Sequence, residues 1–146
     1  METISEFMEA DHRRCDEFFV TAEGAASQGD WDKAQSDFKE FRQAIEQHFA
    51  MEEQALFPRF EEASGNPMGP TQVMRHEHEQ MRELFDEMAD AVAAKNEDDF
   101  LGSAETLLIL MQQHNRKEES ILYPMSDQVL AGERESLLER MRATEV

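Results

Sequence analysis

An eleven-residue stretch of this chain occurs twice, and the repetition limits what the chain can fold into. Residues 48–58 read HFAMEEQALFP and residues 114–124 read HNRKEESILYP. Histidine, two glutamates, leucine, an aromatic residue and proline occupy the same places in both, 66 positions apart. The same offset relates Asp11-His12 to Glu77-His78, and it holds without a gap from His12 to Pro124. The sequence is therefore a duplicated unit.

The unit has the pattern of a helical hairpin. Apolar residues recur at intervals of three and four in four long segments, which is the period of an α-helix. Helix-forming residues dominate, and the 146 residues include only six glycines and four prolines. The predicted helices run over about 4–27, from a cap at Asp30 to about Phe60, from a cap at Thr71 to about Val92, and from about Asp99 towards Ala131.

Two copies of a hairpin predict an all-α protein: an up-down-up-down antiparallel four-helix bundle built from two duplicated helical hairpins. A chain of this length is long enough to bury one sizeable core. We expect residues 1–131 to form the bundle and residues 132–146 to form a short accessory C-terminal helix. Pro58 and Pro124 lie where the helical period continues, so each is expected to bend its helix.

Counting residues from the hairpin turns places four histidines at one level of the bundle. With the first turn near Gly29, His12 lies 17 residues before it and His48 lies 19 residues after it. A helix rises about 1.5 Å per residue, so the two histidines differ in height by roughly 3 Å. The second hairpin repeats both counts for His78 and His114.

A glutamate follows one histidine of each copy by four residues, which places it on the same helix face. Four imidazoles and two carboxylates can therefore converge inside the bundle. Such donors suit iron, manganese or zinc, and the lack of cysteine ligands argues against copper(I) and iron–sulfur clusters. Each half offers two histidines and one carboxylate, so two ions are the natural stoichiometry. The predicted ligands are His12, His48, Glu52, His78, His114 and Glu118.

Two other metal motifs do not fit the sequence. The ferritin-like di-iron class needs Glu-x-x-His on two helices, and that spacing occurs at Glu9 and His12 without a second copy. The stretch HEHEQ at residues 76–80 ends in glutamine where a zinc-protease motif needs its second histidine.

Charge and hydropathy argue against two classes of partner. The formal net charge of −19 disfavours nucleic acid and anionic membrane surfaces, which attract clustered lysine and arginine. The longest apolar run, LLILM at residues 107–111, is far shorter than the roughly 20 residues of a membrane span. The single cysteine, Cys15, fits a reducing compartment, and no signal peptide is evident, so we expect a cytoplasmic protein.

Taken in order, these motifs resemble the hemerythrin-like, or HHE cation-binding, family. The resemblance rests on His12, the His48 stretch ending in Leu-Phe-Pro, the pair Glu77-His78, and the His114 stretch ending in Leu-Tyr-Pro. It covers roughly Phe7 to Asp127. It implies an up-down four-helix bundle with a non-heme centre of two iron ions, bridged by an oxo or hydroxo group, that meets O2, NO or peroxide.

The resemblance also implies a division of labour among the ligands. His12 and His48 would hold one iron, His78 and His114 the other, and Glu52 and Glu118 would bridge them. Oxygen-carrying hemerythrins have a further histidine one turn before the third-helix ligand, where this chain has Met74. The set of four histidines and two glutamates is closer to the iron-cluster-repair and iron-sensing branches of the family.

The function expected from the resemblance is binding or sensing of O2, NO or reactive oxygen species, with a redox partner protein as a further expectation. A di-iron enzyme that removes peroxide or reduces NO is one alternative, and iron storage or iron sensing is another. Zinc or manganese is an alternative occupant. Two six-coordinate irons offer about twelve positions, and the ligands and a bridging oxygen leave roughly one open position on each.

Residues beside the ligands have two interpretations each. Glu53 and Glu119 are rotated by about 100° from the ligands, so we interpret them as solvated carboxylates, with pairing to a histidine N–H as the alternative. His76 is expected on the surface or beside a ligand, and Cys15 is expected to pack in the core rather than act in redox chemistry. Tyr123 either packs with a satisfied hydroxyl or donates to a bound oxidant.

Overall fold

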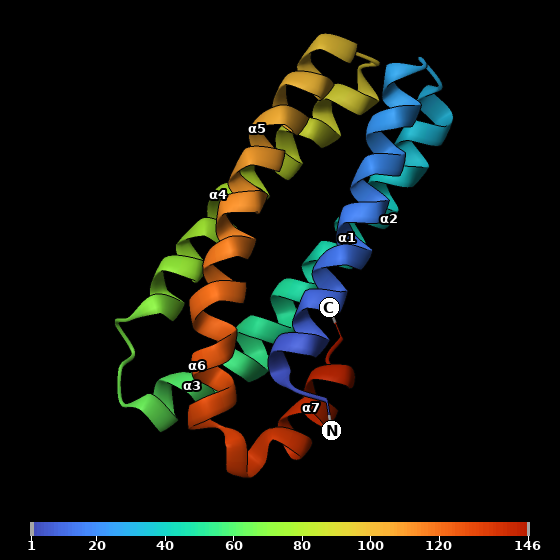
Figure 1. Ribbon diagram of the computed structural model, residues 1–146. Coiled ribbons are helices and arrows are strands. Elements are labelled where there is room, and N and C mark those ends of the chain that lie inside the picture. Colours follow the sequence, from blue (N-terminus) through green and yellow to red (C-terminus); the bar gives the residue numbers. More distant parts are fainter. Residues whose placement is uncertain (1, 146) are drawn as a thin grey trace.

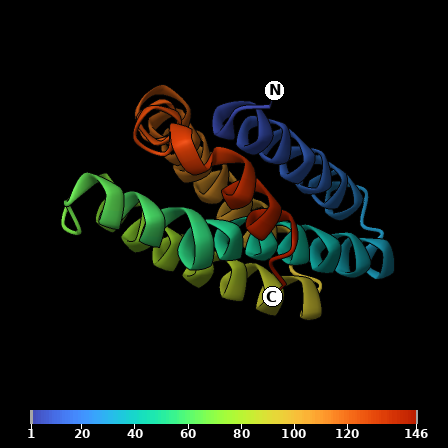
Figure 2. The same cartoon turned by 90° about the horizontal axis from the view of Figure 1, so that it is seen from below.

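The computed structural model describes residues 2–145, and the regular structure within that range is entirely helical. Figure 1 shows two helical hairpins that lie alongside each other, and Figure 2 shows the same arrangement from below. The first hairpin pairs α1 with α2, and the second pairs α4 with α5. An all-helical bundle is therefore confirmed. Its long helices are α1 (Ile4–Ser27), α2 (Trp31–Met51), α4 (Pro70–Ala93) and α5 (Glu97–Lys117).

The local sequence determines where the helices of the first hairpin begin. The Thr3 hydroxyl oxygen accepts a hydrogen bond from the Glu6 N–H, and the Glu6 carboxylate accepts one from the Thr3 N–H. This reciprocal pair is a capping box, which satisfies two backbone donors that a helix start leaves free. Asp30 caps α2 as predicted, because its carboxylate accepts from the Lys33 N–H.

The second hairpin corrects two predicted boundaries. Thr71 does not cap α4, because the helix already begins at Pro70, a residue whose fixed φ and missing N–H suit the first helical position. The Thr71 hydroxyl donates instead to Glu61 at 2.6 Å. The helix α5 begins before Asp99, because the Asn96 side chain accepts a hydrogen bond from the Asp99 N–H.

The helix continues through each repeated proline by changing its hydrogen-bond pattern. Directly after α2 and α5 come two π-helical segments, η1 (Glu52–Leu56) and η2 (Glu118–Leu122). The Phe57 N–H donates to the Glu52 carbonyl and the Tyr123 N–H donates to the Glu118 carbonyl, five residues back. The α-helical pattern then resumes in α3 (Phe57–Ser64) and α6 (Tyr123–Val129), with proline second in each. Wide turns of this kind are frequent at functional sites.

The C-terminal part covers one end of the bundle, next to the start of α1 (Figures 1 and 2). A short 3-10 turn, η3 (Ala131–Glu133), leads into α7 (Arg134–Arg142), which is the predicted accessory helix. It buries Leu137, Leu138 and Met141. The boundary between a bundle at 1–131 and a C-terminal helix at 132–146 stays a prediction.

Buried apolar side chains form two clusters with a polar level between them. The larger cluster includes Phe19, Phe41 and Phe85, and the smaller one joins α3, α6, η1 and α7. In α1 the order is Met8 in the smaller cluster, then His12, then Cys15 in the larger one. The histidines therefore lie in a layer that both clusters shield from water.

No helix within residues 2–145 is both long and apolar enough to span a lipid bilayer.

Candidate metal centre

The structure brings the six predicted ligand residues together in the polar layer. None of these side chains is more than 3% exposed. They come from six elements of the two hairpins, and in both copies the glutamate is the first residue of the π-helix. The residues are His12 on α1, His48 on α2, Glu52 on η1, His78 on α4, His114 on α5 and Glu118 on η2.

The donor atoms form two overlapping groups, each small enough to surround one ion. One nitrogen or oxygen from each residue of a group lies within 4.8 Å of the others. We call the side with His12 and His48 the His12 half, and the side with His78 and His114 the His78 half. The His12 half combines its two histidines with Glu118, whereas the His78 half has both glutamates. Glu118 is therefore common to both groups.

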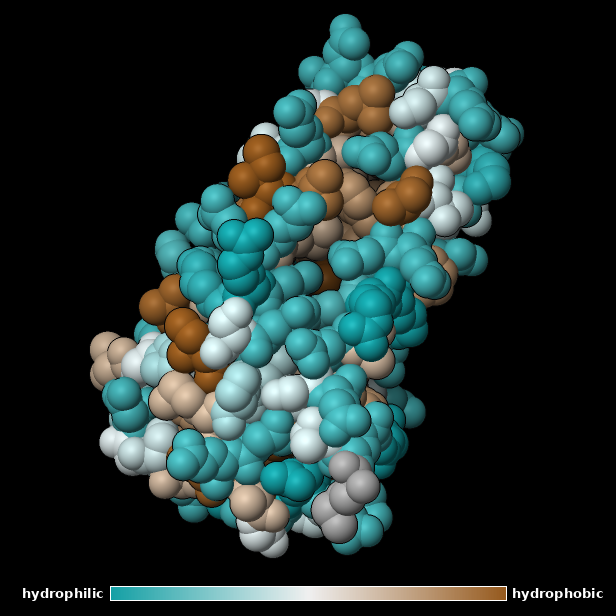
Figure 3. Space-filling model, in the orientation of Figure 1, coloured by the Kyte–Doolittle hydropathy of each residue, from teal (hydrophilic) through white to brown (hydrophobic). Residues whose placement is uncertain are grey.

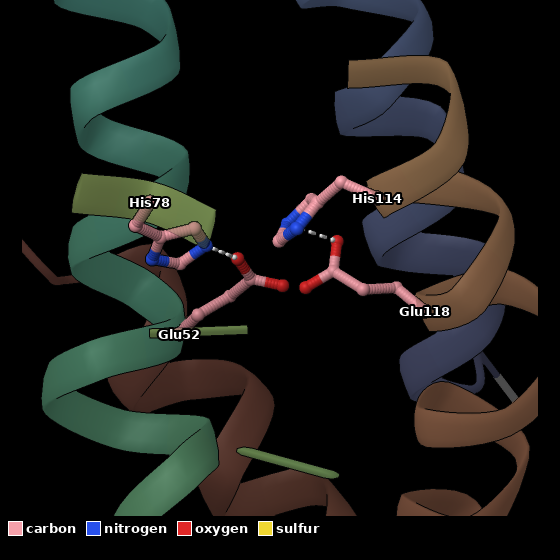
Figure 4. Close-up of side chains that lie close together, drawn as sticks. All are labelled: Glu52, His78, His114 and Glu118. Carbon is pink, nitrogen blue, oxygen red and sulfur yellow. Dashed lines mark ion pairs between the residues drawn. The ribbon is translucent and has the colours of Figure 1, made fainter. Parts of the chain in front are cut away.

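Four buried polar atoms in the His78 half fit a metal because they have no hydrogen-bond partner among the described residues: Glu52 Oε1, His78 Nε2, His114 Nε2 and Glu118 Oε2. Figure 4 shows the four side chains pointing toward one another. His78 Nε2 lies 3.1 Å from Glu52 Oε1, but the angles do not suit a hydrogen bond. Unpaired buried polar atoms are costly, at about 1–3 kcal/mol each. A cation among these atoms would satisfy all four.

The outer nitrogen of each histidine is held by a further carboxylate. An ionised carboxylate only accepts hydrogen bonds, so each Nδ1 carries a proton and each Nε2 is the nitrogen that faces the centre. This is the orientation that a metal ligand requires. The Nδ1–oxygen contacts are His12 with Glu119 at 2.6 Å, His48 with Asp11 at 2.8 Å, His78 with Glu53 at 2.7 Å and His114 with Glu77 at 2.8 Å.

These contacts show that one interpretation from the sequence was wrong. Glu53 and Glu119 are not merely solvated, because each accepts a hydrogen bond from a histidine of the other hairpin. Asp11 and Glu77 hold the second histidine of their own hairpin, a role that sequence reasoning missed. The signal was available, since an acidic residue precedes the first histidine in both copies.

The carboxylates also control the charge of the imidazoles. Burial alone would lower the pKa of His114, but Glu118 and Glu77 outweigh it and raise that pKa to about 10. Burial opposes protonation of His48 as well, and Glu52 and Asp11 raise its pKa well above the usual value. Without a cation, protons therefore occupy the layer, and a metal must displace them.

Tyr123 makes the two halves of the centre different. Its buried hydroxyl lies 2.7 Å from Glu52 Oε2 and 2.9 Å from Glu118 Oε1, close enough to donate to either. It is also 3.2 Å from His12 Nε2 and 3.3 Å from His48 Nε2. Burial and both carboxylates raise the pKa of Tyr123, so the hydroxyl keeps its proton. The satisfied hydroxyl is therefore present, while donation to a bound oxidant stays a prediction.

The His78 half has aromatic rings in the corresponding places. Phe57, the repeat equivalent of Tyr123, stacks near the His78 ring with a centroid distance of 5.8 Å. Phe49 stacks directly on the same imidazole at 3.8 Å and 15° between planes. The His78 half therefore has aromatic rings where the His12 half has a hydroxyl group.

Two other residues singled out in the sequence lie away from this layer of donors. His76 is exposed, as predicted. Cys15 is 2% exposed within the larger apolar cluster, and burial raises the pKa of its thiol to about 11. Its position agrees with packing, since a thiol in that state is a poor nucleophile.

Buried histidines and glutamates at one level of a helical bundle define a metal-binding protein of the hemerythrin-like class. Comparison with protein families agrees: the hemerythrin HHE cation-binding domain matches residues 3–126, which is most of the chain. The chain belongs to this family. No curated protein and no solved structure matches it.

Proposed function

We propose that this protein holds two iron ions in a non-heme centre of four histidines and two glutamates, and that it binds or senses O2, NO or reactive oxygen species there. The fold is then the up-down-up-down four-helix bundle of two hairpins. The observation that carries the proposal is the convergence of four imidazole Nε2 atoms and two carboxylates in a layer closed to water. The unpartnered donor atoms of the His78 half support the same conclusion.

Each ligand has a distinct task in this proposal. The His12 half would hold one ion and the His78 half the other, with Glu52 and Glu118 between them. Glu118 is the stronger candidate for a bridging ligand, because it belongs to both groups of donors. When bound, the ions supply open coordination positions and a change of oxidation state.

The surrounding residues keep the ligands in place and limit access of water. The four carboxylates accept hydrogen bonds from the Nδ1 atoms. These hydrogen bonds fix the ring orientations and raise the basicity of the Nε2 atoms, which face the centre. Met8 and Met74 are buried on one side of the layer, and Cys15 and Met81 on the other. Tyr123 holds a proton beside the carboxylates of the centre.

Anaerobic reconstitution with ferrous iron, followed by air, tests the proposal. We expect two irons per chain and a new charge-transfer band in the near ultraviolet. The variant His78→Ala should lose metal, whereas His76→Ala is a matched control, because it removes an exposed histidine two residues away on the same helix. Fewer than two ions per chain and no band would contradict the proposal. Parallel loading with zinc and manganese identifies the preferred occupant.

Iron storage or sensing is a second candidate, and the unpartnered donor atoms of the layer favour it. Buried polar atoms without a hydrogen-bond partner destabilise the folded state, so the four atoms of the His78 half that lack one within the described residues give the metal-free protein a cost that a cation removes. A metal that binds only the folded state must raise the melting temperature. If metal occupancy is the signal, the metal-free and the loaded protein must differ widely in melting temperature. Equal values would exclude it.

An enzyme is the remaining alternative, and the proton that Tyr123 holds beside the carboxylates favours it. Turnover assays with peroxide or NO and an added reductant separate it from binding. Formation of a stoichiometric adduct without turnover would support the binding or sensing role.

A further inference from the structure

The two grooves beside the centre are equivalent by the repeat, but they are filled differently. A pocket of about 560 Å³ opens between α1 and α5, and its walls include Asp16, Val20, Leu108, Asn115 and Glu119. Figure 3 shows this face hollowed between the two helices, with apolar atoms inside the hollow.

The equivalent groove, between α2 and α4, is covered by large side chains. Arg82 stands where Asp16 stands in the other copy, and Phe49 stands where Asn115 does. The Arg82 guanidinium lies over the Phe49 ring at 5.2 Å and pairs with Glu46 at 2.9 Å. This stack of guanidinium and ring occupies the position of the pocket.

The inner end of the pocket is separated from the centre by the Glu119 side chain. Its carboxylate is 35% exposed and bonded to His12, and no other described residue hydrogen-bonds to it. Its repeat equivalent, Glu53, accepts from His78 and also from two nitrogens of Arg82, at 3.0 and 3.1 Å. Displacing Glu119 therefore breaks one hydrogen bond, whereas displacing Glu53 breaks three.

The walls of the pocket are mixed. Phe19, Val20, Leu108 and Met111 give it an apolar side, and the remaining lining residues are polar or charged. The net charge of −19 disfavours anions. The mixed lining admits a small uncharged molecule, and the choice of O2 or NO comes from the proposed function.

We propose that the pocket between α1 and α5 is the access route of O2 or NO to the centre, and that Glu119 is the side chain that moves to admit it. The proposal rests on the proposed function for the choice of ligand. The placement of the route rests on the different filling of the two grooves.

Dissolved O2 tests the route without iron, because its unpaired electrons speed the relaxation of the nuclei that it contacts. In metal-free and zinc-loaded protein, NMR should show strong relaxation enhancement at the methyl group of Met111, which is buried in the wall of the pocket. It should show little at Ile45, the repeat equivalent of Met111 in the covered groove. Equal enhancement on both faces would overturn the proposal.

The variant Asn115→Phe copies the aromatic ring of the covered groove into the pocket. We expect it to abolish the enhancement at Met111. In iron-loaded protein it should slow NO association about tenfold with the metal count unchanged, because access then waits for rare local opening. Gln113→Phe is the matched control, since it adds the same ring at an exposed position of α5 and should change neither.

The outcomes separate the two proposals. Absence of iron binding together with O2 contacts in the pocket would remove the di-iron function and leave the route. Normal NO binding that is as fast in Asn115→Phe as in the unmodified chain would remove the route and leave the function. Slower iron loading with unchanged O2 contacts would identify a cation route instead and overturn the proposal.

Discussion

The His12 half and the His78 half of the centre come from the same repeated pattern, and they differ in what surrounds it. Each has two histidines whose outer nitrogens are held by carboxylates, and each has a glutamate at the start of a π-helix. Around the His78 half, aromatic rings and Arg82 fill the space. Beside the His12 half are a phenol, a pocket and a loosely held carboxylate.

This difference indicates that duplication preserved the ligands while the surroundings diverged. Phe49 and Arg82 restrict the His78 ring and its carboxylate, so that half is suited to retaining an ion. Tyr123 and Glu119 place a hydroxyl and a carboxylate with a single hydrogen bond among residues 2–145 at the His12 half. The comparison predicts that the His78 half retains its ion firmly and that the His12 half responds to a small ligand.

The largest expected effect comes from removing the ligand that the two halves share. Glu118→Gln should lower the affinity of both ions, because Glu118 belongs to both groups of donors. Glu52→Gln should weaken mainly the His78 half, because Glu52 belongs only to that group. Metal analysis after dialysis measures the difference. Equal retention of metal by the two variants would show that the halves are not organised in this way.

The carboxylates that hold the histidine rings should give the next largest effect. Glu53→Gln and Glu119→Gln should each weaken metal binding by roughly 10–100-fold, the usual loss for such partners of a ligand. Glu53→Gln should be the more severe, because Arg82 also loses one of its two charged partners. Competition between the protein and a chelator for zinc measures both affinities.

A surface variant serves as the control for both. Glu79→Gln removes an exposed carboxylate from α4 and should leave zinc affinity unchanged. An equal loss in Glu79→Gln would attribute the effect to net charge, not to ring orientation.

The amino-acid sequence was sufficient to predict the helices and the six converging residues, because both depend on periodicity and on the repeat. The carboxylate partners were harder to predict. A rotation of about 100° per residue points Glu53 away from the axis of its own hairpin, and its partner His78 lies on a helix of the other one. Periodicity along one helix does not encode the neighbour that packs against it.

Two further features depend on competition between local alternatives. Thr71 and Pro70 are both acceptable at a helix start, and the structure uses proline because Glu61 takes the threonine hydroxyl. The π-helices follow from packing around the ligand glutamates together with proline, and composition gives no separate signal for them.

Replacing Tyr123 with phenylalanine should make the two halves more alike. Its effect should be smaller than that of the carboxylate variants. In metal-free protein the loss of a buried hydrogen bond to a charged group should reduce the free energy of unfolding by about 1.5–3 kcal/mol. In loaded protein the loss should be smaller, since cations then neutralise the carboxylates. Urea denaturation of both forms measures the change. An equal loss in both forms would assign Tyr123 to packing alone.

Acid and base should affect the ligands and their partners in both halves. The pKa of His114 is raised from the ordinary 6.5 to about 10. Its contribution to the stability of the metal-free fold is therefore fully present below pH 6.5 and disappears as the pH rises towards 10. The lowered pKa values of Glu53 and Glu77, about 2, contribute above 4.5 and are lost on acidification. The melting temperature of metal-free protein should therefore be highest between these limits. Calorimetry from pH 3 to pH 10 checks this, and a flat profile would contradict it.

The smallest effect concerns the two hairpin turns, which the repeat makes equivalent. Gly29 and Lys95 both have positive φ, 72° and 56°, and lysine adopts that conformation only with strain. Lys95→Gly should therefore stabilise the second hairpin by about 1 kcal/mol. Thermal denaturation of the variant tests it, and a loss of stability would mean that the lysine side chain contributes a contact of its own.

The π-helices also carry information about the history of the chain. Both begin at the glutamate and end before the aromatic residue and proline, so the extra residue in each was present before the gene was duplicated. A single ancestral hairpin would have had half of the donors, and its second glutamate would have had no histidine to hold. Such a half-length chain could complete its centre only as a two-fold symmetric homodimer, whereas one chain with both hairpins leaves the two sides free to differ.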